Sequence, residues 1–267
     1  MSPTFQSFAN SPSLRALFTR EFRVALINRY FQVFCGLALI GAIAVAIFSE
    51  DANATASFYL QIGLYFVSLF ALLAGVGSAQ AEREEWELLF TQPLPRPAYV
   101  VGKFSALLSI FGLVLVVMFM PGLFVGLPVR TLAALYFETL LLAGAFLACG
   151  LAAGYLAHDR AHALIVGVSA WLLLLFGLDF VALFAARWSA IQNLPDLWVA
   201  LLMLNPLDSF RIHALFALQQ IPAEAANKTP LASWWIAHAG GWFATVAALW
   251  SATLIALAGL RLNHWEE

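Results

Sequence analysis

Residues 140–157 read LLLAGAFLACGLAAGYLA and contain no charged side chain. In lipid, a backbone must satisfy its own hydrogen bonds, so only a helix or a closed barrel can cross a membrane. Barrel strands alternate apolar and polar residues, and this run has no period of two. A helix that rises about 1.5 Å per residue crosses a hydrocarbon core of about 30 Å in roughly 20 residues. The stretch therefore predicts a transmembrane helix.

The rest of the chain repeats this pattern. Of its 267 residues, 63% are hydrophobic and 10% are charged, and the mean hydropathy is +0.86, well beyond what a water-soluble core needs. We predict an all-α polytopic membrane protein with a single domain over residues 1–267. The expected spans are residues 30–48, 58–79, 104–127, 132–157, 163–186 and 236–260. The net charge of -2 and the scattered Lys and Arg residues argue against nucleic-acid binding.

The 13 Lys and Arg residues are distributed unevenly across these spans. Nine lie on the side that carries both termini, and four lie on the other side. The first side comprises residues 1–29, 80–103, 158–162 and 261–267. The second side comprises residues 49–57, 128–131 and 187–235. Because cytoplasmic connections carry the excess of positive charge, we expect both termini in the cytoplasm.

Residues 187–235 form the one long connection on the outer side. Two apolar stretches within it, residues 197–204 and 212–221, are too short to cross a membrane. We therefore predict helices that lie at the outer interface or re-enter the membrane.

The cytoplasmic N-terminus, residues 1–29, ends in an amphipathic stretch, LRALFTREFRVALINR, over residues 14–29. Apolar side chains gather on one helical arc and arginines on the opposite one, although Glu21 falls within the apolar arc. Such a helix lies on the cytoplasmic leaflet, with its arginines among anionic headgroups. Its candidate functional residues are Arg15, Phe18, Arg20, Phe22 and Arg23. The alternative is a plain basic flank that only fixes the orientation of the first span.

The second cytoplasmic connection, residues 80–103, is the most informative part of the chain. Residues 81–104 read AEREEWELLFTQPLPRPAYVVGKF: a charged helix-forming run, an apolar LLF tip, and three prolines that stop the helix. A stiff helix with an apolar tip suits docking into a cleft of a soluble partner. The alternative is a loop that folds back on its own helices. The candidate docking residues are Glu82, Arg83, Glu84, Glu85, Trp86, Leu88, Leu89 and Phe90.

This stretch resembles the connection between the second and third spans of ABC-2 type permeases. The family shows the pattern ERE-x-x-x-x-LL-x-x-P-x-x-R-x-x-x-x-x-GK. Here Pro93, Arg96, Gly102 and Lys103 keep these spacings from the ERE run, whereas the Leu88-Leu89 pair lies one residue earlier than in the pattern. Trp86 departs from the pattern, because many relatives carry a glycine-threonine pair there. The resemblance implies that the amphipathic helix and the segment Glu82 to Phe90 contact an ATPase. It also implies a bacterial inner-membrane complex of two permease copies and two ATPase subunits, in which nucleotide-driven closure rocks the two halves.

A second, shorter resemblance lies in the outer connection. Asn205, Pro206, Asp208, Phe210 and Arg211 are similar to the NP-x-D-x-F-R stretch of the permease of the nitrous oxide reductase maturation transporter. This similarity implies that these residues contact a periplasmic protein, and that the transporter serves the maturation of a periplasmic metalloenzyme.

The chain lacks the phosphate-binding loop G-x-x-x-x-G-K-[ST] in its sequence. Gly102 and Lys103 have no upstream glycine at the required distance, and Phe104 follows them. We therefore expect that this chain hydrolyses no ATP and holds no cofactor or metal. ATP and Mg²⁺ belong to the partner ATPase that the resemblance implies.

Two carboxylates, Glu138 and Asp179, fall inside expected spans, in the outer half of the bilayer. An unpaired charge there costs several kcal/mol, so both should face protein or water. One interpretation places them on a substrate path or outer gate. The other has them protonated, or paired with a nearby arginine such as Arg130 or Arg187, for packing.

Two other classes of protein compete with the permease. An autonomous secondary transporter would show paired helix breaks in two repeats, and Pro121 has no counterpart in the second half. An intramembrane enzyme would need a constellation such as H-E-x-x-H or G-x-S-x-G, and the sequence contains neither. The sequence does not identify a substrate.

Overall fold

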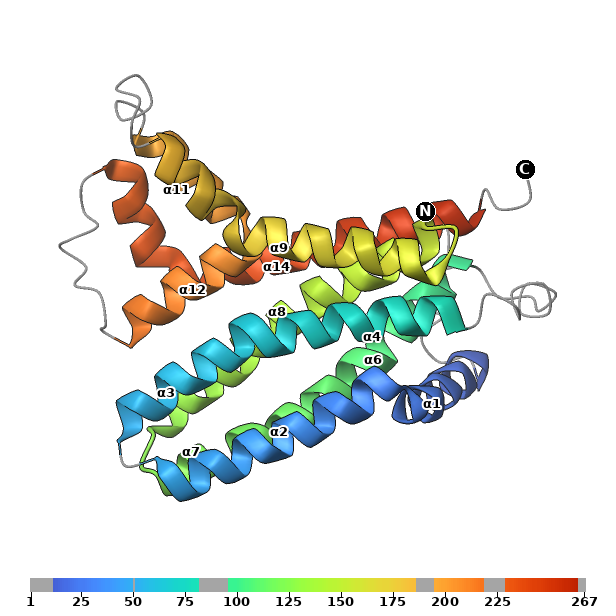
Figure 1. Ribbon diagram of the computed structural model, residues 1–267, viewed down its shortest axis with the longest axis horizontal. Coiled ribbons are helices and arrows are strands. Elements are labelled where there is room, and N and C mark those ends of the chain that lie inside the picture. Colours follow the sequence, from blue (N-terminus) through green and yellow to red (C-terminus); the bar gives the residue numbers. More distant parts are fainter. Residues whose placement is uncertain (1–11, 50, 82–95, 186–194, 219–228, 264–267) are drawn as a thin grey trace.

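The computed structural model describes residues 12–49, 51–81, 96–185, 195–218 and 229–263. Within these ranges every element is helical (Figure 1). The elements are α1 (Pro12–Ile27), α2 (Arg29–Phe48), α3 (Ala52–Gln61), the π-helix η1 (Ile62–Val67), α4 (Ser68–Ala81), α6 (Arg96–Phe119), α7 (Pro121–Phe124), α8 (Val129–Leu156), α9 (Arg160–Ala185), α11 (Pro195–Leu204), α12 (Pro206–Ala217) and α14 (Pro230–Asn263).

Six helical stretches are long and apolar enough to cross a membrane, which confirms the expected fold class and all six spans. They are Arg29–Phe48, Ala52–Ala81, Pro97–Phe124, Val129–Leu156, Arg160–Val181 and Pro230–Leu262. The second, third and sixth begin six or seven residues earlier than expected. Their first turns are too polar to stand out by hydropathy, yet they are helical.

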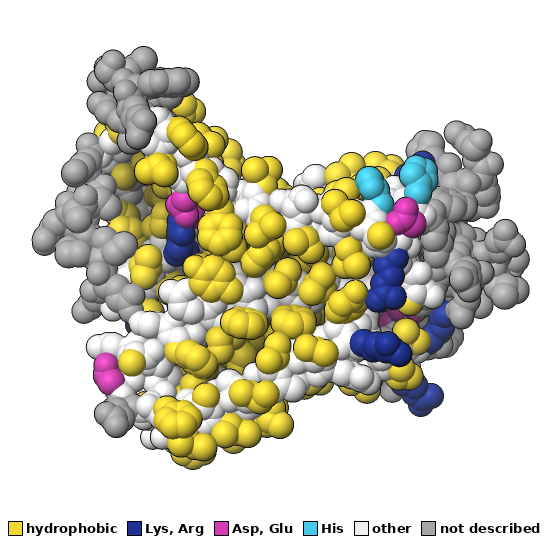
Figure 2. Space-filling view, viewed as in Figure 1, with side chains coloured by type: hydrophobic (Ala, Val, Ile, Leu, Met, Phe, Trp, Pro, Cys, Tyr) yellow, Lys and Arg dark blue, Asp and Glu magenta, His cyan; other side chains and the backbone are white. Residues whose placement is uncertain are grey.

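Consecutive spans run in opposite directions, so the connections between them gather at two ends of the protein (Figure 1). One end, here called the α1 end, holds α1, the start of α6, the turn between α8 and α9, and the end of α14. The opposite end, here called the α12 end, holds the turn between α2 and α3, together with α7, α11 and α12. Lys and Arg side chains gather at the α1 end, and hydrophobic side chains cover the face between the two ends (Figure 2).

The core is built around α8, which packs against α4 and α14. Glycines let α4 and α8 approach closely. A Cβ on Gly75 would lie 2.6 Å from the carbonyl oxygen of Leu147, and one on Gly150 would lie 2.1 Å from that of Leu72. Gly150 and Gly154 form a G-x-x-x-G motif, the pattern that membrane helices use for backbone contact. Packing of small residues therefore holds the central helix pair together.

The connection between α9 and α14, at the α12 end, holds the two predicted short helices. The axes of α11 and α12 meet at a bend of 102°, so the pair does not continue as one straight helix. The expected stretch 197–204 lies within α11, whereas α12 begins six residues before the expected start at residue 212. Asn205 and Pro206 begin α12: Asn205 caps the helix and Pro206 occupies its first position, where a missing N–H costs nothing.

Candidate functional sites

The amphipathic helix α1 lies against α6 at the α1 end. Phe18 and Phe22 stack with ring centroids 6.2 Å apart; Phe22 packs against the core, whereas Phe18 is exposed. Thr19 and Arg23 are exposed, and Arg20 is partly exposed. This arrangement agrees with the predicted amphipathic helix. The side chain of Arg15 lies outside the described part of the structure.

Glu21, the one charged residue of the apolar arc, has a partner that the sequence did not indicate. Its Oε2 lies 3.2 Å from Nζ of Lys103 in α6, and the two side chains are 1% and 0% exposed. Lys103 also donates a hydrogen bond to the Tyr99 hydroxyl at 3.4 Å, with Nζ 5.4 Å from the centre of that ring. Oε1 of Glu21 also lies 3.6 Å from Nη1 of the partly exposed Arg20. Removing one member of a buried pair costs up to about 3–5 kcal/mol, because the other charge loses its buried partner. The pair therefore fixes α1 to the start of the third span.

The predicted docking residues Glu82, Arg83, Glu84, Glu85, Trp86, Leu88, Leu89 and Phe90 lie outside the described residues. The structure does describe the two ends of their segment. It leaves the second span at Ala81 and enters the third at Arg96, and both positions lie at the α1 end, as does α1 itself (Figure 1). The helix α1 and the two described residues that flank the docking segment therefore lie at the same end of the protein.

A second polar site is the corner between α11 and α12, here called the α12 corner (Pro195–Ala217). The side-chain amide of Asn205 stabilises this corner through both its oxygen and its nitrogen. Its Oδ1 accepts from the backbone N–H of Leu207 at 3.1 Å, while its Nδ2 donates to the carbonyl oxygen of Leu174 in α9 at 2.6 Å. The same Nδ2 donates to Oδ2 of Asp208 at 2.5 Å. Asn205 thus ties the first turn of α12 to the fifth span.

Arg211 continues this network by bridging two carboxylates. Its Nη2 lies 2.6 Å from Oδ1 of Asp208, one turn earlier in α12, and its Nη1 lies 3.3 Å from Oδ2 of Asp179 in α9. Asp208 is buried and Asp179 is half exposed, with side-chain exposures of 4% and 53%. The intramembrane carboxylate Asp179 is therefore paired, with an arginine from the bent helix pair.

Glu138, the other intramembrane carboxylate, is also paired with α12. Its Oε1 lies 2.8 Å from Nε2 of His213. Gly240 of α14 leaves room for this imidazole, since a Cβ there would lie 3.3 Å from Nε2. The expected arginine partners are corrected here: Glu138 contacts His213 rather than Arg130, and Arg187 lies outside the described residues. Both partners, Arg211 and His213, come from α12, far from Asp179 and Glu138 in the sequence, so the sequence did not point to them.

The residues of the NP-x-D-x-F-R stretch lie mostly inside the protein. Asn205, Asp208 and Phe210 are 4%, 2% and 0% exposed, and Pro206 is buried as well. Phe210 packs against Phe243 of α14 with ring centroids 5.7 Å apart. Buried side chains cannot contact an external partner in this conformation, so we assign them an internal role in shaping the corner. Arg211, whose side chain is 28% exposed, is the member that reaches the surface.

Two tryptophans of α14 hydrogen-bond to the end of α11, the first helix of the corner. The indole Nε1 of Trp242 donates to the carbonyl oxygen of Met203 at 2.9 Å, and that of Trp250 donates to Leu204 at 3.1 Å. These carbonyls belong to the last turn of α11, which has no intrahelical donor for them. The backbone of α14 is non-helical at His238, one turn before Trp242. The α12 corner is therefore anchored to α8, α9 and α14 at once.

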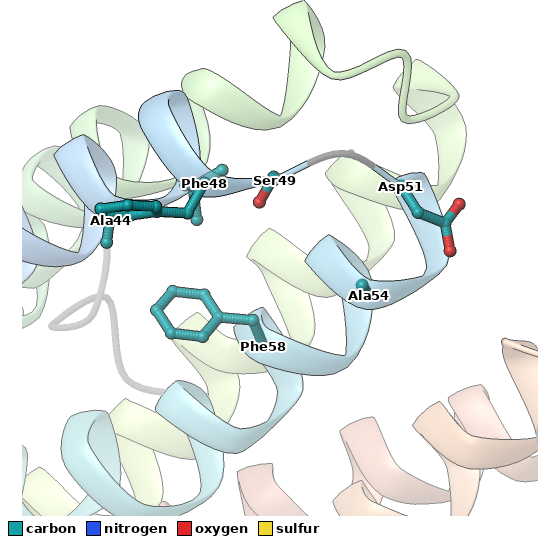
Figure 3. A pocket seen from close by; sticks show the side chains of 7 residues that line it. Ala44, Phe48, Ser49, Asp51, Ala54 and Phe58 are labelled. Carbon is teal, nitrogen blue, oxygen red and sulfur yellow. The ribbon is translucent and has the colours of Figure 1, made fainter.

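A hollow of about 470 Å³ lies at the turn between α2 and α3 (Figure 3). Phe48 and Phe58 contribute its apolar walls. Ser49 and Asp51 are the polar members of its described lining, and the Asp51 carboxylate points outward (Figure 3). The described lining therefore brings few polar groups together, and we assign this hollow no chemistry.

Six apolar spans, an amphipathic helix at one end and a bent helix pair at the other define a polytopic membrane protein. The family profile described as ABC-2 family transporter protein matches residues 16–262, and the chain belongs to this family. It is thus the transmembrane permease subunit of an ABC transporter. Comparison with curated proteins gave no significant match.

Proposed function

We propose that this permease takes its energy from a separate ABC ATPase, through contacts made by α1 and by residues 80–103. The observation that carries the proposal is the buried pair of Glu21 and Lys103. It joins α1 to α6, and α6 begins where the docking segment ends. A displacement of α1 or of the docking segment would therefore be transmitted to the third span, because both are attached to α6.

The proposed orientation places the α1 end in the cytoplasm of a bacterial inner membrane. Lys and Arg gather at this end (Figure 2), as the positive-inside rule requires of a cytoplasmic face. Six spans bring both termini to the same side. ATP and Mg²⁺ would be bound by the ATPase alone, which meets the permease at this end.

The α12 corner is proposed to form the outer gate. In this proposal, the contacts made by Glu138 and Asp179 hold the gate closed. Broken helices commonly surround transport sites, and domain motion needs an element with two stable arrangements. Here the bent helix pair is held to α8 and α9 by the contacts of His213 with Glu138 and of Arg211 with Asp179. Breaking both contacts would remove the charged side-chain contacts of α12 with α8 and α9, while the hydrogen bond from Asn205 to Leu174 would remain. The complete transporter is proposed to contain two permease copies and two ATPase subunits.

A handover of cargo to a periplasmic protein, for the maturation of a metalloenzyme such as nitrous oxide reductase, is the most specific part of the proposal. It rests on the similarity of residues 205–211 to the maturation permease. Because four of the five matching side chains are buried, Arg211 is the contact that we would test first. If Arg211→Ala leaves capture of a periplasmic protein by the intact complex unchanged, this part of the proposal is wrong.

The energy source is tested by co-purification. The full-length permease is expected to co-purify with an ABC ATPase in a fixed ratio, and Leu88→Glu with Leu89→Glu is expected to abolish the association while the permease stays in the membrane. The control is Arg130→Gln, an exposed residue at the opposite end of the protein, which should leave the association with the ATPase unchanged. Transport by the purified permease without an ATPase would contradict the proposal.

A further inference from the structure

A second hollow, of about 320 Å³, lies at the α1 end where four helices meet. It is lined by Val24 and Ile27 of α1, Asn28 of the turn between α1 and α2, Arg29 of α2, Gly77, Ser78 and Ala81 of α4, and Arg160 of α9. This hollow, here called the arginine pocket, belongs to neither polar site described above.

The floor of the pocket exists because α4 ends in small residues. A Cβ on Gly77 would lie 2.9 Å from the Tyr30 ring and 3.3 Å from Nδ2 of Asn28. The glycine therefore lets α2 press closely against α4. Ser78 and Ala81 leave the space above them unfilled, so the hollow results from side-chain size along one face of α4.

Two arginines from different spans face this floor. Arg29 is the first residue of α2 and Arg160 is the first residue of α9. Nη2 of Arg160 donates a hydrogen bond to the Tyr30 hydroxyl at 3.2 Å, and its guanidinium lies 5.5 Å from the centre of that ring. Tyr30 thus holds Arg160 in place from the neighbouring span, which lowers the entropic cost of ordering it around a ligand.

Neither arginine has a carboxylate partner among the described residues, although each lines a concave site. The pocket also offers the Nδ2 amide of Asn28, whose Oδ1 already accepts from the N–H of Tyr30 at 3.0 Å. Two uncompensated guanidinium groups, an amide donor and a serine hydroxyl form a set suited to a phosphate group, whose oxygens accept charge-assisted hydrogen bonds.

The surroundings indicate which phosphate compound fits. Both arginines stand at the first residue of a membrane span, the depth of lipid headgroups, and Ile27 at the rim is 74% exposed. Basic pockets between spans bind anionic lipid headgroups in this way. We propose that the arginine pocket binds the phosphate of an anionic phospholipid, with the acyl chains along the outer faces of α2 and α9. This inference goes beyond the proposed function and does not depend on an ATPase.

Native mass spectrometry of the full-length permease tests the proposal, after release from nanodiscs of phosphatidylcholine doped with phosphatidylglycerol. The wild-type protein is expected to retain phosphatidylglycerol. Arg29→Gln and Arg160→Gln should each lower the retained fraction, by about fivefold, as expected for one basic residue near a lipid surface. Ala81→Leu, which fills the pocket from an exposed position and keeps both charges, should lower it as well.

The matched control is Arg130→Gln, an exposed arginine in the first turn of α8 at the opposite end. It should retain the lipid as the wild type does, and an unchanged thermal unfolding midpoint identifies variants that are still folded. Wild-type retention by Ala81→Leu would overturn the proposal, because it would mean that diffuse charge rather than the pocket holds the lipid. Thermal protection by inorganic phosphate in pure phosphatidylcholine nanodiscs, without retention of phosphatidylglycerol, would instead make a free anion the occupant and overturn the lipid assignment.

Discussion

The Glu21 carboxylate lies 3.2 Å from the Lys103 ammonium group, and both side chains are buried between α1 and α6. An interfacial helix held only by its apolar face could slide or rotate on the lipid surface. A charge pair in a low-dielectric contact allows much less freedom, since moving either group away leaves a buried charge unpaired. The pair therefore makes α1 a fixed attachment of the third span.

Lys103→Met is expected to lower the free energy of unfolding by up to about 3–5 kcal/mol, because Glu21 stays buried and keeps only its longer contact with Arg20, at 3.6 Å. The double variant Glu21→Leu with Lys103→Met should recover most of that loss, since an apolar pair of similar volume replaces the ion pair. Chemical denaturation in lipid nanodiscs measures both. Coupling is measured separately, as the ATPase turnover of the assembled complex, and there the double variant should stay impaired if the charge pair transmits force. If the double variant recovers both the free energy of unfolding and the ATPase turnover, Glu21 and Lys103 contribute only to packing and transmit no force.

The two carboxylates around Arg211 should differ in importance. Asp208 is buried and accepts from Asn205 as well as Arg211, whereas Asp179 is half exposed. Arg211→Gln leaves Asp208 buried without its cation, so we expect a loss of about 3–5 kcal/mol in the free energy of unfolding. Asp179→Asn should cost less, because Arg211 keeps its contact with Asp208 and the substitution leaves no buried charge without a partner.

If the contact made by Asp179 holds the outer gate closed, however, Asp179→Asn should alter transport far more than stability. Transport by the assembled complex and unfolding of the permease are therefore measured on the same preparations. Equal, small effects on both would remove Asp179 from the gate.

The sequence predicted the spans well because lipid imposes a length and a composition that local hydropathy can detect. It was less accurate about where helices begin. The third and sixth spans begin at Pro97 and Pro230, in turns of mixed polarity that hydropathy averages away. Proline in the first helical turn was the available signal, because its missing N–H would be unpaired there anyway.

The sequence could not predict which polar residues meet. Glu21 and Lys103, or Glu138 and His213, come from elements far apart in the chain, so their pairing depends on how the helices pack. One signal was present: Glu21 broke the apolar arc of an otherwise regular amphipathic helix. A lone charge on a buried face indicates a partner of opposite charge, and Lys103 was the cation beside the quoted G-K motif.

The closeness of α4 and α8 can be tested with glycine substitutions. Gly150→Ala is expected to destabilise the fold by about 1–3 kcal/mol or more, because the added methyl group meets the Leu72 backbone, which cannot move aside alone. Gly36→Ala in α2 is the matched control, since a Cβ there meets nothing within 4 Å. Thermal unfolding midpoints of both variants in the same nanodiscs give the comparison. Similar midpoints would mean that the two helices do not touch through Gly150.

The proposed orientation makes a prediction about chemical access from each side of the membrane. Arg23 of α1 and Arg130 of α8 are exposed at opposite ends of the protein. Each is replaced by cysteine in a background where the native Cys35 and Cys149, both inside spans, are alanine. A membrane-impermeant maleimide should label Arg130→Cys in intact spheroplasts and Arg23→Cys only after permeabilisation, because the basic α1 end stays in the cytoplasm. The reverse pattern would place α1 and both ends of the docking segment outside the cell, where no ATPase can reach them, and the proposed energy coupling would be wrong.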